Sequence, residues 1–417
     1  MQTSVHKEAP VAYIVSKELV QVSSLLPSNR LRSMMVHSLV NLMGLLSPGY
    51  SNNAKVQVIS PSRASSEALA VYHSRDYLDF VLDPDNSHPS SATQAVNGAR
   101  LEDLGLEDDC PPFQGLHHYV PLVGGASLTA ARTLTAGLAE IAICWDGGRH
   151  HAQKSRASGF CYVADCILLL LALKRSSLPP LMSSSPETTR KSRTMYLDLD
   201  LHFSDAVSQA FYTQNAFGTS QILTLSIHHS SPGFFPISSL SGLPQPSSPA
   251  FDPFTLAIPL HRGASDTTYA RIWPIVENLF SIFDPDFIVV QCGVDALSGD
   301  PCKTFNWSLG DGVGSLSWYI GKIKSLPGKK LFLGGGGYNS PNAARAWTYL
   351  TSVLVDNPLP LDSQIPDHTM FPSYAPSFTL DVPAGNMQDE NTEAYLTSVE
   401  NCFQEAVVAL EQRLNVR

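Results

Sequence analysis

The sequence lacks the features that would assign it to a membrane or a secreted protein. Its longest strongly apolar run, residues 166–173 of a 417-residue chain, is far shorter than the roughly 20 residues that cross a bilayer. The N-terminus lacks the succession of basic, apolar and small residues that marks a signal peptide. We therefore expect a soluble intracellular protein with no membrane partner.

Disulfide patterning and a basic surface are also missing. The seven cysteines are odd in number and include no Cys-x-x-Cys pair, which favours a reducing compartment, the nucleus or the cytoplasm. A formal net charge of -10 argues against direct binding of nucleic acid, whose phosphate backbone attracts basic surfaces. The same charge is compatible with cationic, lysine-bearing partners.

Two common catalytic signatures are absent as well. No serine or cysteine lies in a recognisable nucleophile elbow or triad, so the sequence indicates no covalent nucleophile. Four consecutive glycines at 334–337 resemble a phosphate loop, but no Lys-Ser/Thr follows them and the GxGxxG order is missing. We therefore reject a nucleotide site there.

Apolar segments and amphipathic segments alternate along the chain. Such alternation is typical of a parallel α/β sheet with helices on both faces, and 43% hydrophobic residues can form a sizeable core. No internal repeat or convincing linker divides the chain. The expected strands are 140–145, 194–202, 221–228, 286–295 and 330–338, and the expected helices are 29–45, 164–174, 205–212, 269–283 and 342–354.

Two segments have the composition of inserted surface loops. Residues 175–193 are rich in Ser and Pro and end in basic residues, and residues 230–253 repeat Ser, Pro and Gly. Such composition predicts loops that are disordered in part.

Residues 195–202 carry the most informative pattern. Read as a strand, they place Asp198, Asp200 and His202 on one face and three leucines on the other, because side chains alternate along a strand. Two carboxylates and an imidazole are costly to bury unless a cation lies against them. Capping or ion pairing is the alternative, but the pattern predicts a metal site.

Polar clusters follow three other apolar runs, where parallel sheets bind ligands. His150 and His151 follow a Gly-Gly turn and form either a positioned pair or an accidental solvated one. Asp295 either caps a helix or completes an Asp, His, Asp set with an open coordination position, as in catalytic zinc sites. Tyr338 follows the four glycines, and a phenol beside zinc can donate a hydrogen bond to an oxyanion.

Together these residues predict metal-assisted hydrolysis of an amide. Zinc would polarise the substrate carbonyl and lower the pKa of its bound water, and a histidine would shuttle the proton. Tyr338 would then stabilise the tetrahedral oxyanion.

The motifs around these residues resemble those of the zinc-dependent class I histone deacetylases, most closely the histone deacetylase 8 type. The similarity runs from about residue 12 to beyond residue 378, in the family's order. It rests on residues 145–152 (WDGGRHHA), 157–162 (ASGFCY), 197–202 (LDLDLH), 231–236 (SPGFFP), 299–301 (GDP), 334–339 (GGGGYN) and 365–368 (IPDH).

This resemblance implies a single-domain arginase-like α/β fold around an eight-stranded parallel sheet. The deacetylase domain would span residues 12–417, with insertions at 175–193 and 230–253 and an N-terminal extension at 1–11. By motif position, zinc would be held by Asp200, His202 and Asp295, and potassium by Asp198, Asp200, His202, Ser226 and Ile227. The catalytic residues would be His150 and His151 flanking the attacking water, Asp198 and Asp205 behind them, and Tyr338 as oxyanion donor.

The resemblance also implies a tunnel for the acyl-lysine. Phe160 and Phe235 would form its aromatic walls, although both suit an ordinary core equally well. Gly159 would accept a hydrogen bond from the lysine amide, and Asp109 would hold the substrate backbone at the rim. By position, Arg32 would line the acetate exit below the metal, and Cys302 would occupy the rim where the family has leucine or methionine.

The chain departs from the family pattern at several positions. Residues 203–206 are Phe-Ser-Asp-Ala where the family has His-Gly-Asp-Gly, which keeps the carboxylate of Asp205. Residues 237–240 replace the usual Gly-Thr-Gly-Asp, and Arg149 stands where family members carry an apolar or aromatic residue. None of these changes removes an expected zinc ligand, either histidine or Tyr338.

The expected activity is therefore zinc-dependent removal of acetyl groups from ε-N-acetyl-lysine in proteins, with histone tails among the substrates. The family implies chromatin regulation, transcription repression, potassium binding and inhibition by hydroxamates that bind zinc. Two alternatives stay open: an acetylpolyamine or small-amide hydrolase on the same fold, and a catalytically silent scaffold within a corepressor complex.

Overall fold

One parallel sheet organises the chain. The computed structural model describes residues 9–51, 54–87, 101–178, 190–213 and 219–415. Their eight-stranded sheet has the order β2-β1-β3-β10-β9-β6-β7-β8, and every neighbouring pair is parallel. The strands are β1 (Ala9–Ile14), β2 (Ala54–Ile59), β3 (Ile141–Cys144), β6 (Thr194–Asp198), β7 (Ile222–His229), β8 (Thr255–Leu260), β9 (Phe287–Gln291) and β10 (Lys329–Leu333).

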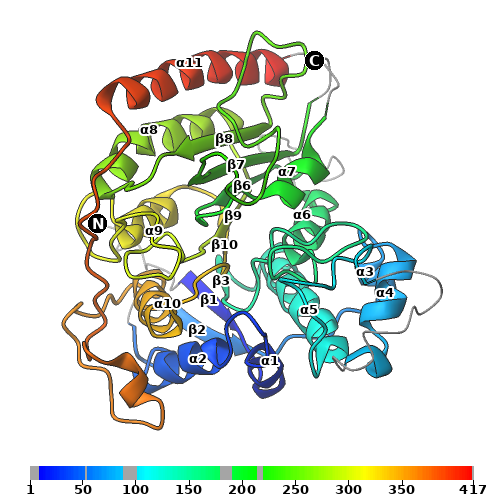
Figure 1. The fold of residues 1–417 in the computed structure, drawn as a ribbon, viewed down its shortest axis with the longest axis vertical. Helices are drawn as coiled ribbons and strands as arrows, with labels where there is room; N and C mark the ends of the chain where they lie inside the picture. The colour runs from blue at the N-terminus through cyan, green and yellow to red at the C-terminus, as the bar shows by residue number, and fades with distance from the viewer. Residues whose placement is uncertain (1–8, 52–53, 88–100, 179–189, 214–218, 416–417) are drawn as a thin grey trace, which may run out of the picture.

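Helices cover both faces of this sheet (Figure 1). One face packs against α2 (Arg32–Leu42), α8 (Asp266–Phe283), α9 (Leu316–Ser325), α10 (Ser340–Leu354) and α11 (Glu393–Asn415). The other face packs against α1 (Lys17–Ser23), α3 (Ser66–Leu69), α4 (Arg75–Val81), α5 (Leu116–Thr135), α6 (Asp165–Lys174) and α7 (Asp205–Phe211). Two short 3-10 helices are η1 (Pro84–Ser87) and η3 (Phe371–Tyr374).

The strand sequences explain why both faces are covered. Along β9, Ile288 and Val290 enter the core on one side, whereas Phe287 and Val289 enter the core on the other. Alternation of wholly apolar residues leaves no face of the strand for water, as in sheets buried between two layers of helices. The predicted α/β fold with an eight-stranded parallel sheet is confirmed.

Three of the expected strands end several residues earlier than predicted. β6 ends at Asp198 rather than at residue 202, β9 ends at Gln291 rather than 295, and β10 ends at Leu333 rather than 338. Beyond Asp198, the Leu199 N–H still donates to the Gln291 carbonyl at 3.0 Å, but the next backbone N–H, that of Asp200, donates to the side chain of Asp198 at 3.1 Å. The polar residues therefore lie in loops just past the strands. Within the described residues, the sequence reading also missed β1, β2 and β8.

The helix expected at 29–45 and the two loop segments also differ in detail. α2 begins at Arg32 because Leu31, its N-cap, has a left-handed φ of 63°. Segment 175–193 contains β4 (Ser177–Leu178) paired antiparallel with β5 (Arg190–Lys191), while residues 179–189 lie outside the described part. Segment 230–253 contains no helix or strand. β1 begins at Ala9, so the sheet includes residues assigned to the N-terminal extension.

Across the described ranges, no helix is both long enough and apolar enough to pass through a membrane.

Aromatic packing anchors the loop that follows β9. Trp307 is fully buried and stacks on Tyr269 of α8, with ring centroids 3.7 Å apart and an interplanar angle of 3°. Its indole N–H donates to the carbonyl of Gly314 at 2.7 Å, and its own carbonyl accepts from Ser298 at 2.9 Å. Trp307 thus ties the loop that carries Asp295 to the helical layer.

We expect Trp307→Ala to lower the free energy of unfolding by about 3–5 kcal/mol, because it removes a buried aromatic side chain and leaves a cavity. Urea unfolding followed by circular dichroism measures the change. Trp318→Ala is the matched control, since Trp318 on α9 is only partly buried and should cost less. Equal destabilisation by the two substitutions would contradict the anchoring role.

Candidate active site

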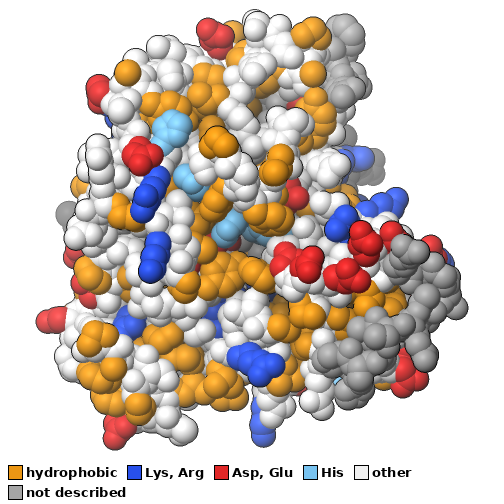
Figure 2. Space-filling view, in the orientation of Figure 1, with side chains coloured by type: hydrophobic (Ala, Val, Ile, Leu, Met, Phe, Trp, Pro, Cys, Tyr) orange, Lys and Arg blue, Asp and Glu red, His pale blue; other side chains and the backbone are white. Residues whose placement is uncertain are grey.

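The polar residues predicted from separate segments meet at one edge of the sheet. β6 ends at Asp198, and Asp200 and His202 follow it directly. The histidine pair follows β3, Asp295 follows β9 and Tyr338 follows β10. These strands are close neighbours in the sheet order, so their carboxyl ends converge. In the orientation of Figure 1, Figure 2 shows histidine side chains reaching the surface between hydrophobic side chains near the middle of the face.

Asp200, His202 and Asp295 form the centre of the site. His202 Nδ1 lies 2.9 Å from Asp295 Oδ2 and 3.3 Å from Asp200 Oδ1. Phe234 stacks on the His202 ring at 5.2 Å and an interplanar angle of 10°, which fixes the direction of that nitrogen. The three expected zinc ligands are thus brought together.

Neighbouring groups orient the two carboxylates. Asp200 Oδ2 accepts from Gln291 Nε2 at 2.8 Å and from the Gly336 backbone N–H at 2.7 Å. Asp295 Oδ1 accepts from the Leu201 backbone N–H at 3.0 Å. Each carboxylate therefore has one oxygen bound by the protein and another turned toward His202.

Glycine is required where the backbone passes these carboxylates. A Cβ atom on Gly336 would lie 2.3 Å from Asp295 Oδ2, and a Cβ on Gly293 would lie 2.1 Å from Asp200 Oδ2. Any side chain at either position would displace a carboxylate. The four-glycine run thus allows close approach to the site, as its sequence suggested.

The electrostatics of the centre favour a bound cation. Burial and then the charge of Asp200 raise the pKa of Asp295 to about 7. Although burial disfavours a charged imidazole, Asp200 and Asp295 raise the pKa of His202 to about 10. Within the described chain, neither aspartate pairs with Lys or Arg within 4.0 Å. Two carboxylate oxygens and one imidazole nitrogen are a donor set that suits zinc and leaves a position for water or substrate.

Cys302 lies closer to this centre than its expected place at the rim suggests. The side-chain ligand atoms of His202, Asp295 and Cys302 all lie within 4.8 Å of one another. Burial, followed by Asp295 and Asp300, raises the thiol pKa of Cys302 well above its usual range, which keeps the sulfur protonated. Cys302 is partly exposed and forms part of the wall beside the ligand group.

Each histidine of the expected catalytic pair has its own carboxylate. His150 Nδ1 lies 2.9 Å from Asp198 Oδ2, and His151 Nδ1 lies 2.7 Å from Asp205 Oδ1. The two rings lie 3.9 Å apart between centroids. With Nδ1 engaged in both rings, each Nε2 is the nitrogen available for chemistry.

The two imidazoles have opposite pKa shifts. Burial disfavours the charged form of both, but Asp198 and Asp200 overcome it and raise the pKa of His150 to about 9. For His151, burial and then the charge of His150 lower the pKa to about 4. The pair therefore offers one proton donor and one proton acceptor.

The altered segment 203–206 retains the contact that matters for His151. Asp205 is the first residue of α7, and its carboxylate reaches the His151 ring. Phe203 is buried and packs against His228 with centroids 4.8 Å apart. The aromatic side chain at position 203 is thus buried against His228.

Tyr338 is held in a fixed position above the glycine run. Its backbone N–H donates to Asp300 Oδ2 at 2.7 Å, and its ring packs against Phe160 with centroids 5.5 Å apart. Burial, then Asp295 and Asp200, raise the phenol pKa of Tyr338 well above its usual value. The hydroxyl therefore remains a hydrogen-bond donor.

The expected tunnel residues surround this centre. Phe235 lies 4.9 Å from the His151 ring between centroids and is 40% exposed, while Phe160 packs on Tyr338. A Cβ on Gly159 would lie 2.5 Å from His151 Cδ2, so only glycine fits there. Asp109, expected to hold the substrate backbone, accepts from the Gly159 N–H at 3.0 Å in this structure.

Arg32 and the expected potassium ligands lie in different parts of the structure around the site. Arg32 is buried below the site, where its Nη1 donates to the Gly337 carbonyl at 2.8 Å. Asp198 and Ser226 are paired in register on β6 and β7, and Ile227 follows Ser226. The structure thus places Ser226 beside Asp198, and potassium binding stays a prediction.

Several residues that shape the site are not among those predicted from the sequence. Gln291 binds Asp200, Asp300 holds the Tyr338 backbone, and Phe234 stacks on His202. The hydroxyl of Tyr196 also donates to Asp198. Gln291 had one available signal, since it is a polar residue at the end of the apolar run 287–290.

The chain is similar to known proteins over most of its length. Residues 27–354 match the family model described as the histone deacetylase domain. Histone deacetylase 8 of Xenopus tropicalis is 37% identical over 388 residues, covering 91% of this chain and 92% of that protein. Histone deacetylase 8 of Danio rerio is 35% identical, covering 93% of both chains, and histone deacetylase 1 of Homo sapiens is 32% identical, covering 88% of this chain and 68% of that protein. The chain therefore belongs to the histone deacetylase family.

Proposed function

We propose that this protein hydrolyses the amide of ε-N-acetyl-lysine in proteins, with histone tails among its substrates, and releases acetate. The observation that carries the proposal is the convergence of a zinc-compatible ligand set, a carboxylate-supported histidine pair and a protonated tyrosine at one sheet edge. Asp200, His202 and Asp295 would hold a zinc ion, which would supply Lewis acidity for the carbonyl and for water.

The histidine pair handles the protons. Because Asp198 and Asp205 occupy the two Nδ1 positions, Nε2 of His150 and of His151 can face the attacking water and the leaving amine. One imidazole removes a proton from water, and a proton is returned to the lysine nitrogen as the C–N bond breaks.

Tyr338 and the aromatic walls position the reacting amide. The neutral phenol of Tyr338 donates to the carbonyl oxygen as negative charge develops there, which stabilises the tetrahedral state. Phe160 and Phe235 enclose the alkyl chain of lysine, and the Gly159 carbonyl accepts from its amide N–H. Arg32, below the glycine run, lies on the route by which acetate leaves.

Several finer expectations belong to the same proposal. Potassium binds near Asp198 and Ser226, and residues 12–417 act as one catalytic domain around the single large sheet. Hydroxamates inhibit by binding the zinc. The protein acts in the nucleus or the cytoplasm. In the nucleus it acts within a corepressor complex.

We expect Tyr338→Phe to lower kcat on acetyl-lysine peptides by about 10²–10³-fold, because it removes a preorganised oxyanion donor. Steady-state kinetics with a coupled acetate assay measures the loss. Tyr395→Phe on α11 is the matched control, since its hydroxyl bonds the Pro259 carbonyl away from the site. Undiminished activity of Tyr338→Phe would exclude this mechanism.

Removing the metal should abolish hydrolysis of acetyl-lysine peptides, and one equivalent of zinc should restore it, because both water activation and carbonyl polarisation depend on the ion. Elemental analysis should find one tightly bound zinc per chain and none in Asp200→Asn/Asp295→Asn. Activity that survives chelation would contradict the assignment. Preference for acetylpolyamines would indicate a small-molecule hydrolase, and inactivity on every amide despite bound zinc would indicate a scaffold.

A further inference from the structure

Arg149 is a buried cation whose hydrogen-bonding capacity is largely unused. It is 5% exposed, and within the described residues its side chain makes one hydrogen bond, from Nη2 to the backbone carbonyl of Asp146 at 3.1 Å. Its buried Nε atom has no partner. Among the described residues, no carboxylate lies within 4.0 Å of the guanidinium. Burial disfavours the charge of Arg149, but nearby groups that include Asp165 and Asp146 outweigh it and raise the pKa of Arg149 above its usual value, so the guanidinium is charged although most of its donors lack a direct partner.

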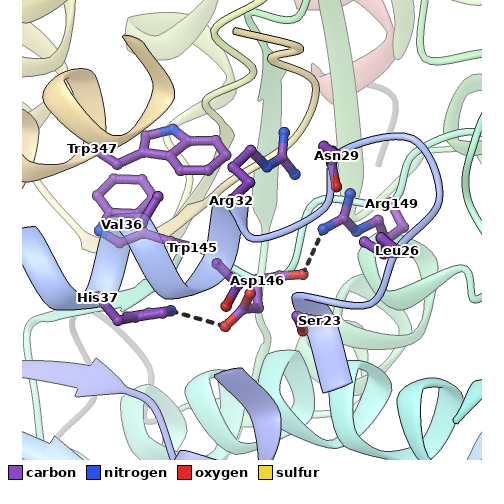
Figure 3. Close-up of a pocket in the computed structure, with 11 residues that line it drawn as sticks. Ser23, Leu26, Asn29, Arg32, Val36, His37, Trp145, Asp146, Arg149 and Trp347 are labelled. Atoms are coloured by element: carbon purple, nitrogen blue, oxygen red, sulfur yellow. Dashed lines mark hydrogen bonds and ion pairs between the residues drawn. The ribbon is translucent and has the colours of Figure 1, made fainter. Parts of the chain in front are cut away.

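The side chain lies between the catalytic centre and a cavity behind it. Arg149 lines the catalytic pocket together with His150, His151 and Tyr338. It also lines the inner cavity drawn in Figure 3, where its head group lies near Asn29 and Arg32. The inner cavity has a volume of about 10 Å³, which is room for one water molecule, so an acyl chain that extends into it from the reacting carbonyl reaches the guanidinium when the lining side chains move apart.

A second arginine makes the inner cavity more strongly positive. Arg32 donates to the Gly337 carbonyl at 2.8 Å, and its guanidinium lies 4.9 Å from the centre of the Trp347 ring. The amide oxygen of Asn29, turned toward Arg32, accepts from it at 3.1 Å. All of these partners are neutral. Burial and then Arg149 lower the pKa of Arg32 to about 10, which still leaves it charged near neutral pH.

The nearby carboxylates are engaged elsewhere. Asp146 Oδ2 is bonded to His37 Nε2 at 2.9 Å, as Figure 3 shows. Asp165 accepts from the backbone N–H groups of Gly148 and Arg149 at 2.9 and 2.7 Å and from the hydroxyl of Ser127. Neither acid therefore supplies the guanidinium of Arg149 with a direct partner.

We propose that Arg149 binds the terminal carboxylate of a short dicarboxylic acyl group, so that the protein removes malonyl, succinyl or glutaryl groups from lysine. This inference rests on the proposed amide hydrolysis. Guanidinium groups pair with carboxylates through two parallel hydrogen bonds, and the unused donors of Arg149 suit that geometry. The reaction is balanced as for acetyl: water adds to the carbonyl, the C–N bond breaks, and the diacid and the free lysine amine are released.

The most direct test compares the hydrolysis of charged acyl groups with that of neutral acyl groups of the same shape. Peptides carrying malonyl-, succinyl- or glutaryl-lysine are assayed beside the same peptides with the terminal carboxylate replaced by a carboxamide. We expect kcat/KM of zinc-loaded wild-type protein to favour at least one charged acyl group by roughly 10- to 100-fold, the effect of one charge-assisted bond in a buried site. Arg149→Leu should remove the preference, and Arg149→Lys should retain part of it.

Controls separate binding from folding. Arg132→Leu, at an exposed position of α5, should keep the wild-type ratio. Isothermal titration with free succinate should give weaker binding to Arg149→Leu than to the wild type, provided that thermal unfolding and zinc content of the two agree. If Arg149→Leu does not fold, the wild-type ratio and Arg149→Lys still decide the question.

The outcomes distinguish this inference from the proposed function. Hydrolysis of acetyl-lysine without any preference for charged acyl groups overturns the role of Arg149 and leaves deacetylation intact. Failure to hydrolyse any of these amides overturns both. If Arg149→Leu weakens inhibition by acetate but leaves the charged-to-neutral ratio unchanged, the arginine serves the product rather than the acyl tail, and the inference is wrong.

Discussion

Burial of several carboxylates at one edge of a parallel sheet is the constraint on which the site depends. Asp198, Asp200 and Asp295 are almost completely buried, and ionised carboxylates in such surroundings need hydrogen bonds and a positive charge. Backbone N–H groups, Gln291 and two histidines meet part of this need. A cation held between Asp200, His202 and Asp295 would meet the rest, so the burial of these acids supports the proposed metal site.

The backbone must come very close to these groups, and this explains the distribution of glycine around the site. Gly293 and Gly336 touch the ligand carboxylates, and Gly159 touches His151. Asp300 then holds the chain just beyond the glycine run, where Tyr338 must be fixed. The absence of a side chain at these glycines allows the backbone to come close. Beyond them, the hydrogen bond to Asp300 and the Phe160 ring hold Tyr338 in one position.

Charge is arranged differently in the cavity behind the centre. There, Arg32 and Arg149 face neutral partners, while Asp146 and Asp165 are bound to other groups. The catalytic pocket therefore lies between an anionic ligand set and a cationic floor. A substrate with its carbonyl at the ligand set and a carboxylate at the cationic floor would complement both, and the proposed role of Arg149 in acyl-group specificity rests on this arrangement.

The sequence by itself determined the fold class, the local order of elements and the chemical character of the ligand set, because apolar periodicity and the run of acids at 198–202 depend only on neighbours in the chain. It placed the strand ends too late, because the point where a ladder gives way to side-chain bonding depends on partners distant in sequence, such as Gln291 for Asp200. Only the tertiary structure decided that Phe234 stacks on His202, that Cys302 lies beside the ligands, and that the Arg149 guanidinium is buried without a carboxylate. Each of these facts depends on loops that are far apart in the sequence and converge at the sheet edge. A local sequence pattern does not predict how such loops lie relative to one another.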